Sequence, residues 1–314
     1  MSFSTILTSE SSISVIADAD WLRTTITEAT NYFPSRTGIQ SVATDHSRGD
    51  SDPEQLAERI LQELQEIIDE QAEGRHDALR LLLKGARGLK TLPRSYFLQN
   101  IKCDRAAGPL IGSGFGSVYR GKWDSQDVAL KTFRAFILYE HSNNEKFAAF
   151  LREIIIWRQL NHPNIHKFLG VENEVLFPRM AIVSHWEPHG NINQTIRELS
   201  LTDLTSLRPQ WILGIALGLE YLHSHRIVHG DLRGDNILVD EELHIRLTDF
   251  GLTTLADSKT RTNGSMSGQT PMAWAAVELM YDLPRPNFAC DVYSFGCTCI
   301  EIYWRNGQAT QEVS

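Results

Sequence analysis

The sequence has few cysteines and no long apolar run, and each absence excludes a class of protein. The four cysteines in 314 residues are Cys103, Cys290, Cys297 and Cys299. They lack the spacing of a metal site, so we expect buried free thiols in a reducing compartment. No stretch of about eighteen apolar residues occurs, because Asp291 and Glu301 interrupt the best candidate, residues 288–304. We therefore expect no membrane span.

Basic residues are fewer than acidic ones, 30 against 39. The formal net charge is −9, which argues against a broad nucleic-acid-binding surface. Residues 1–12 contain no basic stretch leading into an apolar core, so no secretory signal is predicted. We expect a cytoplasmic protein, with the nucleus as the alternative location.

The N-terminal third divides into two regions. Residues 1–50 are rich in Ser and Thr without a sustained period, and we expect them to be mostly disordered, with a short helix near Trp21. Residues 51–98 are predicted to be a helical extension. A capping box with proline in the first turn begins at Ser51, and apolar residues follow at helical spacing. A second helix is predicted from about His76 to Lys84.

These helices have two interpretations. They either form an autoregulatory or partner-binding pair within residues 51–90, or they are packed on the neighbouring domain or loosely tethered to it. The second interpretation is favoured.

From about Phe97 the pattern changes to short β-type runs separated by glycine turns. Strands are predicted at 110–111, 117–120, 127–131, 168–171 and 180–183. Helices are predicted at 144–160 and 209–223. The order is a sheet-rich part followed by a helix-rich part, which indicates an α+β fold.

Four segments carry residue types suited to phosphoryl transfer, which requires a held triphosphate, metal to neutralise charge and a positioned hydroxyl. Glycines at 112, 114 and 116 form a turn whose backbone N–H groups can approach phosphate. Lys131 ends an apolar strand, and Glu153 on the following helix is a suitable counter-ion.

The other two segments are acidic. Asp231 can accept or orient a hydroxyl proton, and Asn236, five residues later, can hold a metal ion from the same loop. Asp249 lies eighteen residues after Asp231, and its carboxylate is a hard oxygen ligand suited to Mg²⁺.

Together, the glycine-rich loop, VALK at 128–131, the helix glutamate, HGDLRGDN at 229–236 and DFG at 249–251 resemble the protein kinase signature set in order and spacing. The resemblance covers about residues 99–314. It implies a two-lobed kinase fold, with an antiparallel β N-lobe over about 99–186 and a mostly helical C-lobe over 187–314. The motif DVYSFG at 291–296 resembles the central C-lobe helix, whose aspartate braces the catalytic loop.

By resemblance, Lys131 contacts ATP phosphates and pairs with Glu153 in the active state, and Asp231 is the catalytic base. Arg233 stands where serine/threonine kinases usually carry a lysine that contacts the γ-phosphate. Asn236 and Asp249 are the implied Mg²⁺ ligands. The implied nucleotide-binding residues, besides Lys131, are Ile111, Gly112, Gly114, Gly116, Val118, Ala129, Ser184, Trp186 and Leu238.

The implied function is transfer of the ATP γ-phosphoryl group to protein hydroxyls. Similarity to the tyrosine-kinase-like group favours serine and threonine over tyrosine. The alternative is a pseudokinase or scaffold that binds nucleotide or partners without efficient transfer. All five chemically required side chains are present, which favours the enzyme.

Three departures from the family pattern stand out. The glycine loop is one residue short, Gly230 replaces the arginine that reads a phosphate on the activation segment, and Val277 replaces a proline. The chain also ends 23 residues after Asp291. We expect a C-terminally truncated domain that exposes part of its C-lobe core to water.

Overall fold

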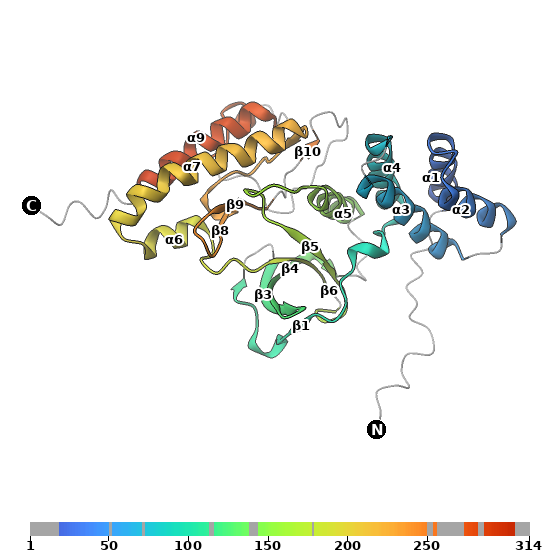
Figure 1. The fold of residues 1–314 in the computed structure, drawn as a ribbon, viewed down its shortest axis with the longest axis horizontal. Coiled ribbons are helices and arrows are strands. Elements are labelled where there is room, and N and C mark those ends of the chain that lie inside the picture. The colour runs from blue at the N-terminus through green and yellow to red at the C-terminus, as the bar shows by residue number, and fades with distance from the viewer. Residues whose placement is uncertain are drawn as a thin grey trace, which may run out of the picture. The chain divides into compact units, whose positions relative to one another are not determined.

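A computed structural model describes residues 19–49, 52–70, 73–112, 116–137, 144–177, 179–249, 254–255, 273–281 and 286–304. The chain divides into two compact units. The first comprises residues up to 97 together with 137–152, and the second comprises 98–136 and 153–314. Figure 1 shows the elements of each.

The first unit is built mainly from four helices, α1 (Ala19–Tyr32), α2 (Thr37–Arg48), α3 (Pro53–Asp69) and α4 (Arg75–Leu89), followed by the short η2 (Arg94–Tyr96). Helix α3 packs against α2 and α4, and α1 packs against α4. The prediction that residues 1–50 are mostly disordered is wrong for 19–49. Apolar side chains such as Ile26, Ile39 and Val42 are buried there, and helical threonines return their hydroxyls to carbonyls one turn earlier.

Helix α3 shows why this unit is stable. Its N-cap is Asp52, whose side chain accepts from the N–H of Glu54. The cap is therefore one residue later than the predicted Ser51, which lies outside the described residues. The inward face of α3 buries Ile60, Leu64 and Ile68 almost completely, as the apolar spacing predicted.

The second unit begins with a six-stranded sheet in the order β1-β3-β4-β6-β5, with β2 also paired to β3. Its strands are β1 (Lys102–Cys103), β2 (Ile111–Gly112), β3 (Gly116–Trp123), β4 (Gln126–Ile137), β5 (Phe168–Glu172) and β6 (Arg179–His185). The short η3 (Arg105–Ala107) precedes β2, and α5 (Asn144–Arg158) follows β4.

The β3–β4 register assigns side chains to two faces. Val118 lies opposite Lys131 and Arg120 lies opposite Ala129, so these residues share one face. The alternate residues Val128 and Leu130 point to the other face, where they are fully buried in an apolar cluster. One face of the sheet is thus core, and the other carries the predicted phosphate-contacting lysine.

The rest of the second unit is mainly helical. Its elements are α6 (Ile192–Glu198), α7 (Leu201–Ser224), β7 (Ile227–Val228), η4 (Gly234–Asn236), β8 (Ile237–Val239), β9 (Ile245–Leu247), β10 (Thr254–Leu255), α8 (Glu278–Tyr281) and α9 (Phe288–Trp304). Helices α7 and α9 run side by side (Figure 1). The α+β prediction, with sheet first and helices second, is confirmed.

Helix α7 begins earlier than predicted. It starts at Leu201, with Ser200 as a cap that accepts from the N–H of Asp203, and it continues through Pro209. Proline removes one helical hydrogen bond. The helix nevertheless continues because Leu204 and Trp211 are both buried on either side of the proline.

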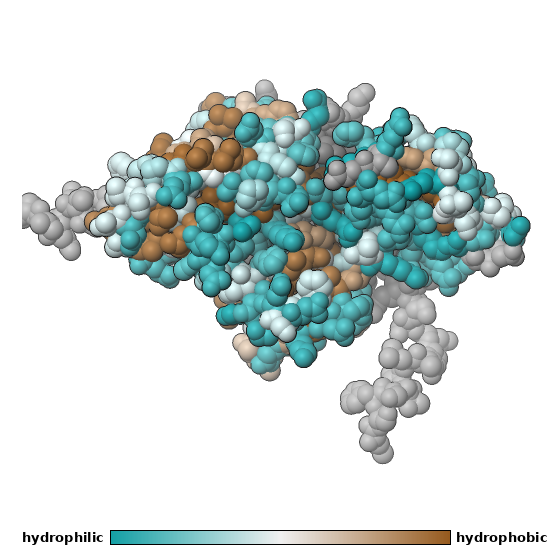
Figure 2. Space-filling model, viewed as in Figure 1, coloured by the Kyte–Doolittle hydropathy of each residue, from teal (hydrophilic) through white to brown (hydrophobic). Residues whose placement is uncertain are grey.

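Part of the surface over α7 and α9 is apolar (Figure 2). On α9, Ile300 is 65% and Trp304 is 76% exposed, and on α7 Leu213 is 60% exposed. Apolar side chains of both helices therefore face outward here.

The cysteines of the described residues are free thiols, as expected. Only Cys290 is buried, whereas Cys103, Cys297 and Cys299 are half-buried, so the expected burial is wrong for three of them. None of the helices in the described ranges is both long and apolar enough to cross a membrane.

Candidate active site

The β8–β9 hairpin brings the two acidic motifs together. Ile237 pairs with Leu247 in its register, which leaves Asn236 and Asp249 just beyond the paired ends. The Thr248 N–H donates to the Asn236 carbonyl at 3.0 Å and closes this end of the hairpin. Residues separated by thirteen positions in the sequence are thereby neighbours.

Asp231 and Asn236 lie in one buried hydrogen-bonded turn. The Asn236 Nδ2 donates to the Asp231 carbonyl at 2.7 Å and to its Oδ2 at 2.9 Å. Both residues are less than 5% exposed. Because Nδ2 donates to Asp231, the amide oxygen of Asn236 is left as its ligand atom.

Arg233 carries the positive charge of this loop. Its Nη1 pairs with Asp235 Oδ2 at 2.9 Å, and its Nε lies 3.8 Å from Asp231 Oδ2. The Arg233 side chain is 27% exposed, so it can turn between its loop partner and an incoming anion.

In this structure Lys131 pairs with Asp249 and not with Glu153, the partner that the resemblance implies for the active state. The Lys131 Nζ donates to Asp249 Oδ1. Within the described residues, no ion pair joins Lys131 to Glu153, although Lys131 does lower the pKa of Glu153 through space.

The two acids differ in pKa, for two reasons: burial and the contact with Lys131. Burial raises the pKa of Glu153 to about 7, against the opposing effect of Lys131, with Asp249 adding to the rise. Burial would also raise the pKa of Asp249, but the adjacent Lys131 lowers it below its ordinary value. Asp249 thus keeps its negative charge, whereas Glu153 is poised to be neutral. Asp249 also adopts a left-handed backbone, with φ of 60°.

Asp291, at the start of α9, holds the loop that precedes Asp231. Its carboxylate accepts from the backbone N–H groups of His229 and Gly230, each at 2.8 Å. His223 Nε2 lies 2.8 Å from the same carboxylate. Gly230 has φ of 79°, a left-handed conformation that glycine adopts without steric cost. The contact expected between Asp291 and this loop is present.

Three more polar residues of α9 face the loop at 229–236 or the segment before α8. Their role was not predicted from the sequence. Ser294 donates to the Trp274 carbonyl at 2.8 Å. Thr298 is 3.4 Å from the Leu232 carbonyl. Glu301 accepts from Gly234 and from Trp274. With Asp291, they recur at steps of three and four residues on one helix face. That spacing was the available signal, but Glu301 was read only as an interruption of an apolar run.

The predicted nucleotide-binding residues lie mainly on the sheet. Val118, Ala129 and Lys131 share the face described above, and Ser184 is 7% exposed in β6. The Trp186 N–H donates to the Asp127 carbonyl at 3.2 Å.

The remaining nucleotide-binding predictions are less fully described. Leu238 is half-buried in β8. Ile111 and Gly112 form β2, paired with β3, and Gly116 is the first residue of β3. Gly114 lies outside the described residues.

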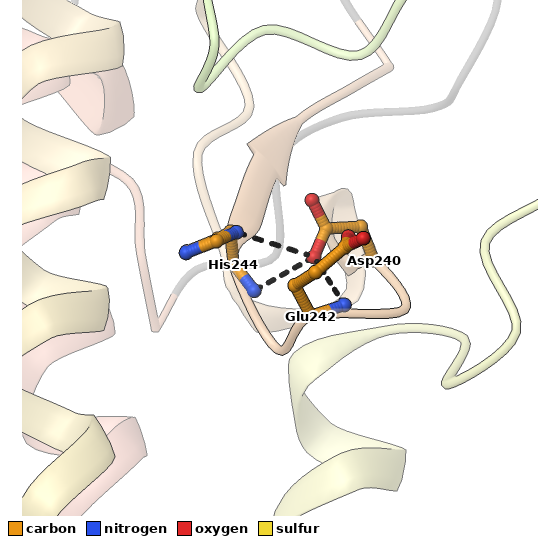
Figure 3. A group of neighbouring side chains, drawn as sticks. All are labelled: Asp240, Glu242 and His244. Atoms are coloured by element: carbon orange, nitrogen blue, oxygen red, sulfur yellow. Dashed lines mark hydrogen bonds and ion pairs between the residues drawn. The ribbon is translucent and has the colours of Figure 1, made fainter.

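A second acidic cluster, Asp240, Glu242 and His244 (Figure 3), is explained by its turn. The Asp240 Oδ1 accepts from the N–H groups of Glu242 and His244, and its Oδ2 pairs with Arg246 at 2.9 Å. The carboxylate is therefore already used by the β8–β9 turn. Arg246 also lies 3.5 Å from the buried Glu187.

Comparison with known families agrees with this arrangement. Residues 107–314 match the model of the family described as protein tyrosine and serine/threonine kinase. The chain belongs to this protein kinase family.

Named relatives include kinases of both acceptor types. The chain is 34% identical over 205 residues to the serine/threonine-protein kinase CTR1 of Arabidopsis thaliana, covering 64% of this chain and 24% of CTR1. It is 31% identical over 201 residues to the human receptor tyrosine-protein kinase erbB-4, covering 63% and 15%. The match to the probable serine/threonine-protein kinase SIS8 of Arabidopsis thaliana is 34% over 199 residues, covering 62% and 18%. The chain thus spans a quarter or less of the length of these relatives.

The residues present fit the ATP and Mg²⁺ that the family implies. The donor set would be an amide oxygen from Asn236 and a charged carboxylate from Asp249, both oxygen ligands of the kind that Mg²⁺ prefers. Lys131 supplies one cation on the open face of the sheet for phosphate. Bound Mg²⁺ would neutralise charge on the phosphates.

Proposed function

We propose that this chain is an ATP-dependent protein kinase that transfers the γ-phosphoryl group to serine or threonine hydroxyls of a protein substrate. The observation that carries the proposal is the convergence of Asp231, Asn236 and Asp249 at one end of the β8–β9 hairpin, with Lys131 bonded to Asp249. Each of these groups has a separate task in phosphoryl transfer.

The roles follow from charge and burial. Asp231 would orient the substrate hydroxyl and accept its proton as the new O–P bond forms and the bond between the γ-phosphorus and the ADP oxygen breaks. Asn236 fixes the Asp231 carboxylate by donating to Oδ2. Lys131 and Arg233 are the cations available to the phosphates.

The location that we propose is cytoplasmic.

The preference for serine and threonine rests on the sequence resemblance to the tyrosine-kinase-like group and on relatives such as CTR1, which is named a serine/threonine-protein kinase. The similar identity to erbB-4, named a tyrosine kinase, makes acceptor choice a question for direct measurement. Three peptides that differ only in Ser, Thr or Tyr at the acceptor position would answer it.

One observation favours a second candidate, a nucleotide-binding pseudokinase. Lys131 is bonded to Asp249 while Glu153 is buried with its pKa raised to about 7. In this arrangement Lys131 is not paired with Glu153, the helix glutamate that the resemblance implies as its partner for transfer.

The test is transfer of labelled phosphate from ATP with Mg²⁺ by the full chain, compared with an Asp231→Asn variant. We expect wild-type transfer and a loss of at least about a hundredfold in the variant, because its proton acceptor is gone. Transfer retained by Asp231→Asn would show a contaminant or a different base. Folded protein that gains thermal stability with Mg-ATP but transfers nothing would identify a pseudokinase.

Asp124→Asn is the matched control. Asp124 is exposed in the β3–β4 turn with φ of 46°, a left-handed conformation that asparagine tolerates. The same chemical change outside the site should leave transfer and melting temperature near wild type.

A further inference from the structure

We propose that Glu301 is a positioning residue that couples Trp274 to the loop containing Asp231. This inference rests on the proposed kinase function for its catalytic consequence, but the coupling itself can be measured without transfer.

Glu301 joins three segments that are distant in the sequence. Its Oε2 accepts from the Trp274 indole Nε1 and from the Gly234 backbone N–H, each at 3.0 Å. Its Oε1 accepts from Asn193 Nδ2 at 2.8 Å. One carboxylate therefore fixes α6, the loop at 229–236 and the segment before α8. Bonds to a charged acceptor are stronger than neutral ones.

Asn193 and Gly234 fit each other closely at this point. Asn193 is 2% exposed, and a Cβ on Gly234 would lie only 2.6 Å from Asn193 Oδ1. Glycine at 234 thus lets the loop approach α6 closely enough for both residues to reach Glu301.

The contacts continue to the catalytic aspartate. The same Asn193 Nδ2 donates to Asp235 Oδ1 at 3.0 Å. Asp235 Oδ2 pairs with Arg233, whose Nε lies 3.8 Å from Asp231 Oδ2. A displacement of Trp274 would therefore reach Arg233 and Asp231 through Glu301 by successive polar contacts.

The contacts from Trp274 through Glu301 to this loop matter because position 230 carries no arginine. Gly230 has no side chain with which to sense a phosphate on the activation segment. Through Trp274 and Glu301, the position of the segment before α8 can be sensed by an indole N–H instead. The coupling that we propose needs no phosphate.

Backbone hydrogen exchange of the full chain tests the coupling. Trp274→Phe removes the indole donor while keeping an aromatic ring, and we expect exchange of the Gly234 amide to rise about tenfold. In a Glu301→Ala background, Trp274→Phe should add nothing further, because the two residues act through one contact. Additive effects, or an unchanged Gly234 amide in Trp274→Phe, would overturn the proposal.

Trp211→Phe is the matched control. Trp211 is a buried indole whose Nε1 donates to the Leu243 carbonyl at 2.8 Å, away from the loop at 229–236. It should leave the exchange of Gly234 at the wild-type rate. An equal rise in this control would mean general loosening and would also overturn the coupling.

Kinetics then test the catalytic consequence. We expect Trp274→Phe to lower kcat about tenfold with little change in KM for ATP, since the affected loop positions Asp231 and not the nucleotide. A fall in kcat together with a rise of similar size in the KM for ATP would assign Glu301 a purely structural role. If exchange shows coupling but the wild type transfers no phosphate, the proposed kinase function fails and the coupling stands.

Discussion

Helices α3 and α9 are both seventeen residues long and have opposite patterns. Helix α3 turns Ile60, Leu64 and Ile68 inward, as an amphipathic helix of a folded unit does. Helix α9 turns polar groups toward the loop at 229–236, with Asp291 first and Glu301 last. Its outward face carries exposed Ile300 and Trp304.

The difference indicates what the inward face of each helix contributes. Burying apolar side chains stabilises a unit without specifying any particular loop geometry. A buried carboxylate is costly unless donors satisfy it, and those of α9 are satisfied by N–H groups of the loop that carries Asp231. The inward face of α9 thus fixes the position of this loop, which apolar burial alone does not.

Removing the first polar group of α9 should have the largest effect. Asp291→Ala leaves the N–H groups of His229 and Gly230 buried without their acceptor. We expect unfolding free energy to fall by about 3–5 kcal/mol, as when one partner of a buried pair is removed. Phosphate transfer should be lost. Urea denaturation with a parallel transfer assay measures both.

Asp45→Ala controls for the loss of one aspartate. Asp45 forms a partly exposed ion pair with Arg59, of a kind that contributes about 0–1 kcal/mol. If Asp291→Ala costs no more than this control, the view of α9 as the support of the loop is wrong.

Glu153 contrasts with the hydrogen-bonded carboxylates of α9, because no described residue donates a hydrogen bond to its buried carboxyl group. Its pKa is raised from 4.5 to about 7 in the folded chain, so the folded state binds more protons than the unfolded state between these values. Its contribution to stability is present below pH 4.5 and is lost as the pH rises through 7.

A Glu153→Gln variant should lack this titration. Relative to wild type, it should gain about 3 kcal/mol of unfolding free energy between pH 4.5 and 8, at 1.4 kcal/mol per pKa unit. Denaturation curves of both proteins across that range supply the difference. Curves that stay parallel would mean that burial does not raise the pKa of Glu153 in solution.

The sequence predicted those parts of this comparison that have a local pattern. The apolar spacing of α3 was visible in the sequence, and the order of Lys131, Asp231 and Asp249 predicted the candidate site. The short helix expected near Trp21 falls within α1. The length of α1 and the whole of α2 were missed because Ser and Thr, such as Thr25, can bond within a helix as well as break it.

The contacts of Lys131 and Glu301 could not be predicted in the same way. Whether Lys131 bonds to Glu153 or to Asp249 depends on where the fold places each acid, a tertiary property. Burial raises the pKa of Glu153, whereas contact with Lys131 lowers that of Asp249. Glu301 meets Gly234 and Trp274 only after the fold brings three segments together.

The same substitution, isoleucine to valine, made once on each helix should have the smallest effect on stability. It compares the two helices most directly. Ile60 on α3 is fully buried, whereas Ile300 on α9 is 65% exposed. Removing one methyl group by Ile60→Val should cost about 1 kcal/mol through lost burial and a small cavity. Ile300→Val should stay within about 0.5 kcal/mol of wild type, because its side chain already contacts water. Urea midpoints of the two variants measure the contrast. An equal cost at both positions would show that the outward face of α9 is covered in solution.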